Sequence, residues 1–132
     1  MYLFTYKTYA QYALACVILL FFLFSCKKDI RYKRFNPYAF QADINGCDGT
    51  RRVQIVYLDS IKDDFKGMWE SQLLEILGRP NKQELDERNK KSYVYHFAPG
   101  KQCMFGTGEV RSVVVDFDGL NRVERISYRV EP

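Results

Sequence analysis

The fold is decided by the run at residues 111–130, which reads RSVVVDFDGLNRVERISYRV. Its first part, Arg111–Phe117, places every second residue, two valines and a phenylalanine, on one face, which is typical of a half-buried strand. Asp118–Asn121 is typical of a turn, because Asp, Gly and Asn favour turn conformations. A further strand is predicted over Val123–Val130, where Ile126, Tyr128 and Val130 alternate in phase. The run therefore predicts an antiparallel hairpin.

A further strand is predicted at Ser92–Phe97, where three aromatic residues share one face and Val94 and His96 share the other. The preceding stretch, residues 81–91, is polar or charged apart from Leu85. We therefore expect that stretch to be a loop or a short exposed turn.

The clearer of two predicted helices begins near Trp69 and carries one apolar stripe formed by Trp69, Leu73, Ile76 and Leu77. It is expected to end at Gly78, which can adopt a left-handed conformation, because Pro80 cannot continue a helix.

An earlier helix is predicted over Arg51–Ile61 from the spacing of Val53, Val56, Tyr57 and Ile61. Alternation of Val53, Ile55 and Tyr57 leaves a strand open as the second interpretation. Taken together, the elements predict an α+β domain over residues 41–132, in which two helices pack on a three-stranded antiparallel meander.

The N-terminal region places Cys26 directly after the apolar run Ala13–Phe24 and before two lysines. A small residue followed by cysteine at the end of such a run resembles a bacterial lipoprotein signal, in which Cys26 is acylated. We therefore expect a signal peptide at residues 1–25 and a lipidated basic tether at residues 26–40, with the membrane as a partner through acyl chains on Cys26.

Two other interpretations of the apolar run stay open, a membrane anchor and a buried helix of a cytosolic protein. A spanning helix needs about 20 apolar residues, whereas Ala13–Phe24 supplies 12. Basic residues after the run would hold the folded part in the cytoplasm if the segment were not cleaved.

Charge is concentrated in the predicted tether. Residues 27–34 contain five basic residues and one acidic residue, a local charge of +4, and with Lys7 this leaves residues 35–132 at about −1. Such a run suits anionic lipid headgroups, although a solvated leash is the other interpretation. No basic stripe interleaved with aromatics continues into the body, so no nucleic-acid partner is expected.

The predicted body contains two cysteines, Cys47 and Cys103. A pair in a small exported domain predicts a disulfide. Two free thiols or a metal site are the alternatives, but the pair lacks CxxC spacing and the chain has a single histidine. No metal or cofactor is expected.

No catalytic residue is predicted. His96 lies on a strand without a recognisable nucleophile, so a structural role is expected. Asp116 and Asp118, two positions apart, could share a proton or a cation, but Asp118 is better explained as the first residue of a turn.

The motifs that carry a family resemblance are Gly67-Met68, Leu73-Leu74, Leu77-Gly78-Arg79-Pro80-Asn81, Tyr93-Val94-Tyr95 and Val115-Asp116-Phe117-Asp118, followed by Val123 and Ile126. Over Ile61–Tyr128 the chain resembles the small outer-membrane assembly lipoproteins of the BamE (SmpA/OmlA) type. The resemblance implies a lipid-anchored module of the cell envelope, at the outer membrane and facing the periplasm, that binds other proteins and has no enzymatic activity. A BLIP-like inhibitor or ligand-binding module on the same two-layer fold is the alternative.

The candidate partner surface consists of Trp69, Met104 and Phe105, because exposed large apolar groups mark contacts. Trp69 stands where the family's second helix usually has a Ser or Thr cap, and the alternative role for Trp69 is to close the core.

Overall fold

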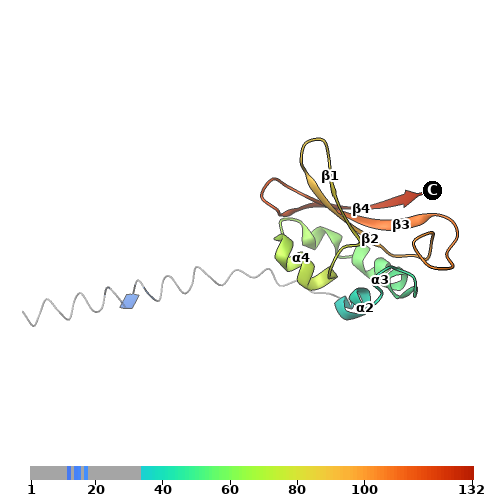
Figure 1. Ribbon diagram of the computed structural model, residues 1–132. Helices are drawn as coiled ribbons and strands as arrows, with labels where there is room; N and C mark the ends of the chain where they lie inside the picture. The colour runs from blue at the N-terminus through green and yellow to red at the C-terminus, as the bar shows by residue number, and fades with distance from the viewer. Residues whose placement is uncertain (1–11, 13, 16, 18–33) are drawn as a thin grey trace, which may run out of the picture.

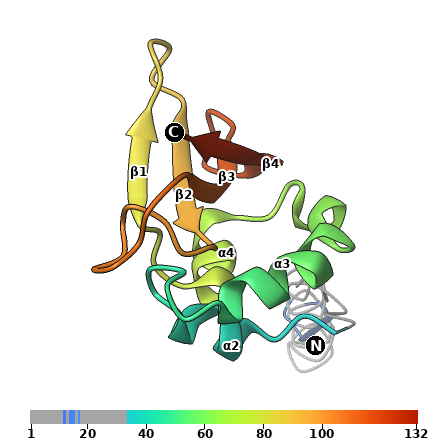
Figure 2. The same cartoon turned by 90° about the vertical axis from the view of Figure 1, so that its right-hand side faces the viewer.

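The computed structural model of the chain describes residues 12, 14, 15, 17 and 34–132. The body has two layers, with an antiparallel sheet on one side and short helices on the other (Figures 1 and 2). Cys26 and most of the predicted signal and tether lie outside the described residues. Within the described part, no helix is long and apolar enough to cross a bilayer.

The α+β class is as predicted, but its details differ. The described residues form three α-helices where two were predicted, and four strands where three were predicted. The helices are α2 (Pro37–Ala42), α3 (Thr50–Asp59) and α4 (Glu70–Leu77), and a 3-10 turn, η1 (Lys62–Phe65), lies between the last two.

Helix α2 is the helix that the sequence did not predict. Asn36 caps it by accepting a hydrogen bond from the Ala39 N–H at 3.2 Å, and Pro37 suits the first helical turn. The structure also differs from the predicted tether boundary, because Phe35 and Phe40 are buried in the core. The folded body therefore begins no later than Phe35.

Helix α3 was predicted, but its predicted apolar face is buried only in part, at Tyr57 and Ile61. Val53 and Val56 are 58% and 69% exposed, whereas Arg51, Gln54 and Leu58 are buried. The polar residues face inward because the neighbouring segments offer them hydrogen-bond partners, described below with the site.

Helix α4 forms as its apolar stripe predicts, with Leu73, Ile76 and Leu77 buried. Its first turn is held by the Trp69 N–H, which donates to Gln72 Oε1 at 3.1 Å. It ends at Gly78, whose φ of 74° lies in the region that favours glycine.

The sheet has the order β1-β2-β3-β4, built from β1 (Lys82–Leu85), β2 (Lys91–His96), β3 (Val110–Phe117) and β4 (Val123–Glu131). The prediction of a loop over residues 81–91 was wrong for β1. This strand is at the sheet edge and pairs with β2 from Lys82↔Val94 to Leu85↔Lys91. It lacks an apolar pattern because most of its side chains are exposed.

Strand β4 keeps its apolar residues in contact with the core by means of a bulge. Val123 and Ile126, both buried, are three positions apart, which strict alternation would place on opposite faces. The register shifts between Asp116 and Phe117, and Glu124 has no partner residue on β3. The extra residue restores the phase, so both apolar residues face the helices.

Hairpins β1–β2 and β3–β4 close with the same five-residue turn. Their sequences are DERNK at residues 86–90 and DGLNR at residues 118–122. In each, the Asp Oδ1 accepts from the N–H groups two and four residues further on, at 2.8 to 2.9 Å. The Asn of each turn is left-handed, with φ of 57° and 58°.

The core lies between the two layers. Aromatic rings from both layers meet there, with Phe40 6.0 Å from Tyr95 and Tyr93 5.0 Å from Phe117 between ring centroids. The fully buried apolar residues include Phe40, Leu58, Ile61, Phe65, Leu73, Leu77, Tyr95, Val113, Val115 and Phe117.

Candidate functional site

The outer face of the sheet, turned away from the helices, carries a groove of about 660 Å³. Its centre is one cross-strand row, because the register aligns Glu84 with Ser92, Ser92 with Asp116, and Asp116 with Arg125. The lining is completed by side chains from both hairpins and the loop after η1: Lys66, Leu85, Asp86, Arg88, Lys90, Glu124 and Arg129.

An ion pair between the two edge strands, β1 and β4, spans the outer face of the sheet. Arg129 Nη1 on β4 lies 2.8 Å from Glu84 Oε2 on β1, although β2 and β3 separate those strands and adjacent strands are about 4.8 Å apart. The two side chains can meet only because the outer face curves inward. Val94 and Val114 are therefore buried even though they point away from the helices.

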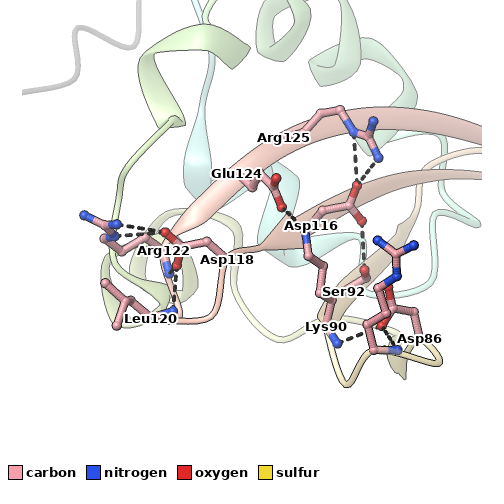
Figure 3. Close-up of polar contacts among 10 residues, drawn as sticks. Asp86, Lys90, Ser92, Asp116, Asp118, Leu120, Arg122, Glu124 and Arg125 are labelled. Atoms are coloured by element: carbon pink, nitrogen blue, oxygen red, sulfur yellow. Dashed lines mark hydrogen bonds and ion pairs between the residues drawn. The ribbon is translucent and has the colours of Figure 1, made fainter.

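The carboxylate of Asp116 occupies the centre of the row (Figure 3). Ser92 Oγ donates to Asp116 Oδ1 at 2.8 Å, and the Arg125 guanidinium donates to Oδ2 at 2.8 and 3.1 Å. Nearby, Lys90 Nζ lies 3.0 Å from Glu124 Oε2. The central acids are thus already matched by cations of the same groove.

The groove therefore has a mixed and almost balanced charge. Five of its lining residues are basic and four are acidic. Such a surface suits a partner that carries both charges or a row of polar groups, rather than a phosphate, which needs unopposed cations.

The two candidate aspartates do not act together. Asp118 Oδ2 lies 3.0 Å from Arg122 Nη2, and Asp116 is held by Arg125 and Ser92. Backbone hydrogen bonds, first of all from Arg122, hold the pKa of Asp118 below its usual range. Asp118 organises the turn, as predicted. Within the described residues, no group of three or more His, Cys, Asp or Glu could hold a metal ion.

His96 is paired with a residue that the sequence analysis did not single out. Its Nδ1 lies 2.8 Å from the Oγ of Ser112, directly across the strand pair, and both residues are buried. Burial lowers the pKa of His96. The alignment of His96 with Ser112 depends on the register of β2 against β3, which the long loop between these strands leaves unspecified in the sequence. Because Ser112 is fully buried, its hydroxyl has no contact with solvent.

Arg51 is the largest buried polar side chain and also escaped the sequence analysis. Its Nε donates to the Phe40 carbonyl at 2.8 Å, and its Nη1 to the Ile44 and His96 carbonyls at 2.8 and 3.1 Å. The guanidinium also lies 4.6 Å from the centre of the Phe40 ring. Burial lowers the pKa of Arg51, while Asp43 acts in the opposite direction.

Asn81 and Asp43 complete the polar cluster around Arg51. Asn81 Oδ1 accepts from Arg51 Nη1 at 2.9 Å and from the His96 N–H at 2.9 Å. Asp43 accepts from the N–H groups of Asp48 and Arg51, at 3.1 and 3.0 Å, and so supplies the cap that Gly49 cannot give to α3. This cluster joins α2 and α3 to the end of β2.

The predicted disulfide between Cys47 and Cys103 is present, with the Cα atoms 5.8 Å apart. It joins the loop before α3 to the loop between β2 and β3. Gly46 makes this approach possible, since a Cβ on it would lie 2.6 Å from the His96 carbonyl oxygen. The Asn45-Gly46-Cys47 segment therefore packs directly against the end of β2.

The three residues of the candidate partner surface do not form one patch. Trp69 is half exposed and bridges to Arg122, at the turn that follows β3. Met104 and Phe105 lie in the loop that precedes β3, at the other end of that strand (Figure 1). These two are 90% and 92% exposed.

The loop that displays Met104 and Phe105 is stabilised by backbone hydrogen bonds within the loop. The Cys103 N–H donates to the Gly100 carbonyl at 2.9 Å, and the Gly106 N–H donates to the Cys103 carbonyl at 3.0 Å. With the disulfide, these contacts fix both sides of the loop tip. Two adjacent apolar side chains are therefore presented to solvent by an ordered support.

Comparisons of the chain with protein-family models, with curated proteins and with solved structures found no match.

Proposed function

We propose that this chain is a lipid-anchored protein of the bacterial cell envelope, attached through Cys26 at the outer membrane and facing the periplasm, and that it acts as a non-enzymatic protein-interaction module of the BamE-like type. The observation that carries the interaction role is the ordered display of Met104 and Phe105. Adjacent apolar side chains at this exposure are typical of contact sites. The Cys47–Cys103 disulfide supports an oxidising compartment.

The anchor is tested by the intact mass of the protein extracted from membranes, with and without reduction. We expect an acylated mass that begins at Cys26 and a gain of two hydrogen atoms on reduction. The variant Cys26→Ser should leave the membrane fraction, whereas Cys16→Ser, a matched control ahead of the cleavage site, should not. An unprocessed chain that is unaffected by Cys26→Ser would refute the anchor.

The interaction role is tested by a photo-crosslinking residue introduced at Phe105 in growing cells. We expect one protein adduct of defined mass, lost when Met104→Ser removes the neighbouring apolar group. The control position is Leu120, an exposed apolar residue at the opposite end of β3. Equal, diffuse labelling from both positions would count against a partner at the loop tip.

The groove supports the second candidate, a BLIP-like inhibitor or ligand-binding module. A volume of about 660 Å³ is within the usual range of ligand sites, although charged residues dominate its lining. In that case Asp116→Asn, which keeps the shape of the groove, should reduce binding of a soluble ligand or enzyme, and crosslinking at Phe105 should be unaffected.

A further inference from the structure

The outward surface of the helix layer carries exposed apolar side chains. On α3, Val53 and Val56 are 58% and 69% exposed. Because residues of a helix are about 100° apart, these valines and Arg52 lie on the opposite side from the buried residues Arg51 and Leu58. This side of α3 faces away from the sheet.

Helix α2 adds an aromatic residue to the same side of the molecule. Tyr38 is 84% exposed and lies about 200° around the helix from the buried Phe40. The two helices are joined by the Asn36 N–H, which donates to Gln54 Oε1 at 2.8 Å. Both lie on the face of the body that is remote from the sheet (Figures 1 and 2).

The described body begins in the helix layer. The Asn36 N–H is bonded to the buried Gln54 of α3, and Arg34 is two residues upstream of Asn36. Arg34 is eight positions after Cys26, and a chain of that length can span at most about 28 Å. A body of this length has a radius of gyration of about 13 Å and is therefore more than 30 Å across, taken as roughly spherical. An anchor at Cys26 is too short to pass around the body and bring the outer face of the sheet to the membrane.

Charge favours the same orientation. Residues 27–34 carry a net charge of +4, and Arg52 is exposed on α3. The acidic residue at the end of α3, Asp59, is engaged by Lys62 at 2.8 Å and by the hydroxyl of Tyr128 on β4 at 3.0 Å. Basic groups close to a bilayer are attracted to anionic headgroups.

We propose that the helix-layer surface formed by Tyr38, Arg52, Val53 and Val56 docks onto the anionic lipid surface that holds Cys26. This inference rests on the proposed function, because acylation of Cys26 sets the length of the tether between the membrane and Arg34. Apolar side chains of this surface enter the boundary between headgroups and acyl chains, with the tyrosine ring at headgroup level. The loop tip with Met104 and Phe105 then remains free for a partner.

The test uses the full acylated chain in vesicles of phosphatidylethanolamine and phosphatidylglycerol. A nitroxide is attached at Val56→Cys and, as the matched control, at Val130→Cys, an exposed valine on β4. We expect the label at position 56 to collide more with dissolved oxygen and less with a water-soluble nickel chelate than the label at position 130. Replacing phosphatidylglycerol by phosphatidylcholine should reduce this difference.

The outcomes separate this inference from the anchor itself. An acylated protein whose labels at 56 and 130 behave alike overturns the docking surface and leaves the anchor standing. A label at position 56 that is shielded from both oxygen and nickel means that a second copy covers the surface, which also overturns lipid docking. A mass without acyl chains refutes the anchor. As a second variant, Val53→Ser with Val56→Ser should keep the acyl mass and abolish the preferred orientation, measured with the label at Tyr38→Cys.

Discussion

Arg51 carries a positive charge into the interior, where no ion pair links it to a carboxylate among the described residues. Its hydrogen bonds go instead to backbone carbonyls and to Asn81, which lie in segments far apart along the chain. Buried acceptors that lose such a donor cost about 1 to 3 kcal/mol each. Arg51 is thus the side chain on which the junction of α2, α3 and β2 depends.

We expect Arg51→Met, which keeps an unbranched apolar stem but removes the donors, to lower the free energy of unfolding by at least about 3 kcal/mol, because several acceptors lose their partner together. The measurement is urea unfolding of the oxidised protein. The adjacent Arg52→Met is the control and should change stability by less than about 0.5 kcal/mol, since Arg52 is exposed. Equal effects at the two positions would contradict this role for Arg51.

His96 makes stability depend on pH. Burial lowers its pKa in the folded state below the ordinary value of 6.5, and Lys82 and Arg51 act in the same direction while Glu131 opposes them. The unfolded chain therefore binds the proton more readily. The stabilisation from neutral His96 is complete above about pH 6.5 and decreases as the pH falls towards the folded-state pKa.

The variant His96→Gln should remove the part of this dependence that begins as the pH falls below about 6.5, while leaving the acid unfolding caused by carboxylates. Chemical unfolding at a series of pH values measures the slope. A slope in the variant as steep as in the natural chain would show that another group is responsible.

The buried residues of α3 show what pattern analysis could not supply. The helix was predicted from apolar residues at helical spacing, and two of these, Val53 and Val56, are exposed. The inward positions of Arg51 and Gln54 depend on acceptors and donors contributed by distant residues, such as the His96 carbonyl. No local pattern in the sequence encodes such partners, so the polar cluster around Arg51 could not be predicted from the sequence.

At the level of elements, the sequence predicted the parts that bury their own apolar residues. Helix α4 and strands β2, β3 and β4 each show the periodicity of a half-buried element, and each lies close to its predicted position. Strand β1 was missed because, at the sheet edge, its backbone pairing holds it in place while its side chains are mostly exposed. Helix α2 has only six residues, too few for a helical pattern to stand out.

The matched hairpin turns provide a test at this scale. Asn121 has a φ of 58°, which most side chains adopt only at a cost of about 1 kcal/mol or more, whereas glycine adopts it freely. Asn121→Ala should therefore destabilise the protein by about 1 kcal/mol, and Asn121→Gly should be close to neutral, as measured by thermal unfolding. An equal loss in both variants would mean that the asparagine side chain itself is needed. Asn89, in the equivalent position of the first hairpin, should show the same order.

At the level of the whole molecule, the disulfide links the helical half to the strand half. Cys47 and Cys103 are 56 residues apart, and closing a loop of that size lowers the entropy of the unfolded chain, which raises its free energy by about 4 kcal/mol in the usual model. We expect the double variant Cys47→Ser, Cys103→Ser to lose stability of this order in urea unfolding, as should the reduced natural chain. Cys16→Ser, outside the pair, should have no effect on the body.

The pairing of the two cysteines could be predicted because the predicted body contains only these two. The groove could not, since its row combines one residue from each of four strands, and β1 had not been recognised. The separation of Trp69 from Met104 and Phe105 likewise depends on which end of β3 each loop adjoins. Sites assembled by register need the complete sheet before they can be seen.

The covalent link also determines how the molecule would respond to mechanical load. If force is applied at one point before Cys47 and another after Cys103, tension bypasses the intervening chain through the sulfur atoms. Helix α3, helix α4 and strands β1 and β2 lie inside that shielded stretch and cannot be pulled straight, whereas α2, β3 and β4 remain extensible. With one point of attachment before Phe35 and the other after β4, the load would therefore fall first on Phe35, Phe40 and the β3–β4 hairpin.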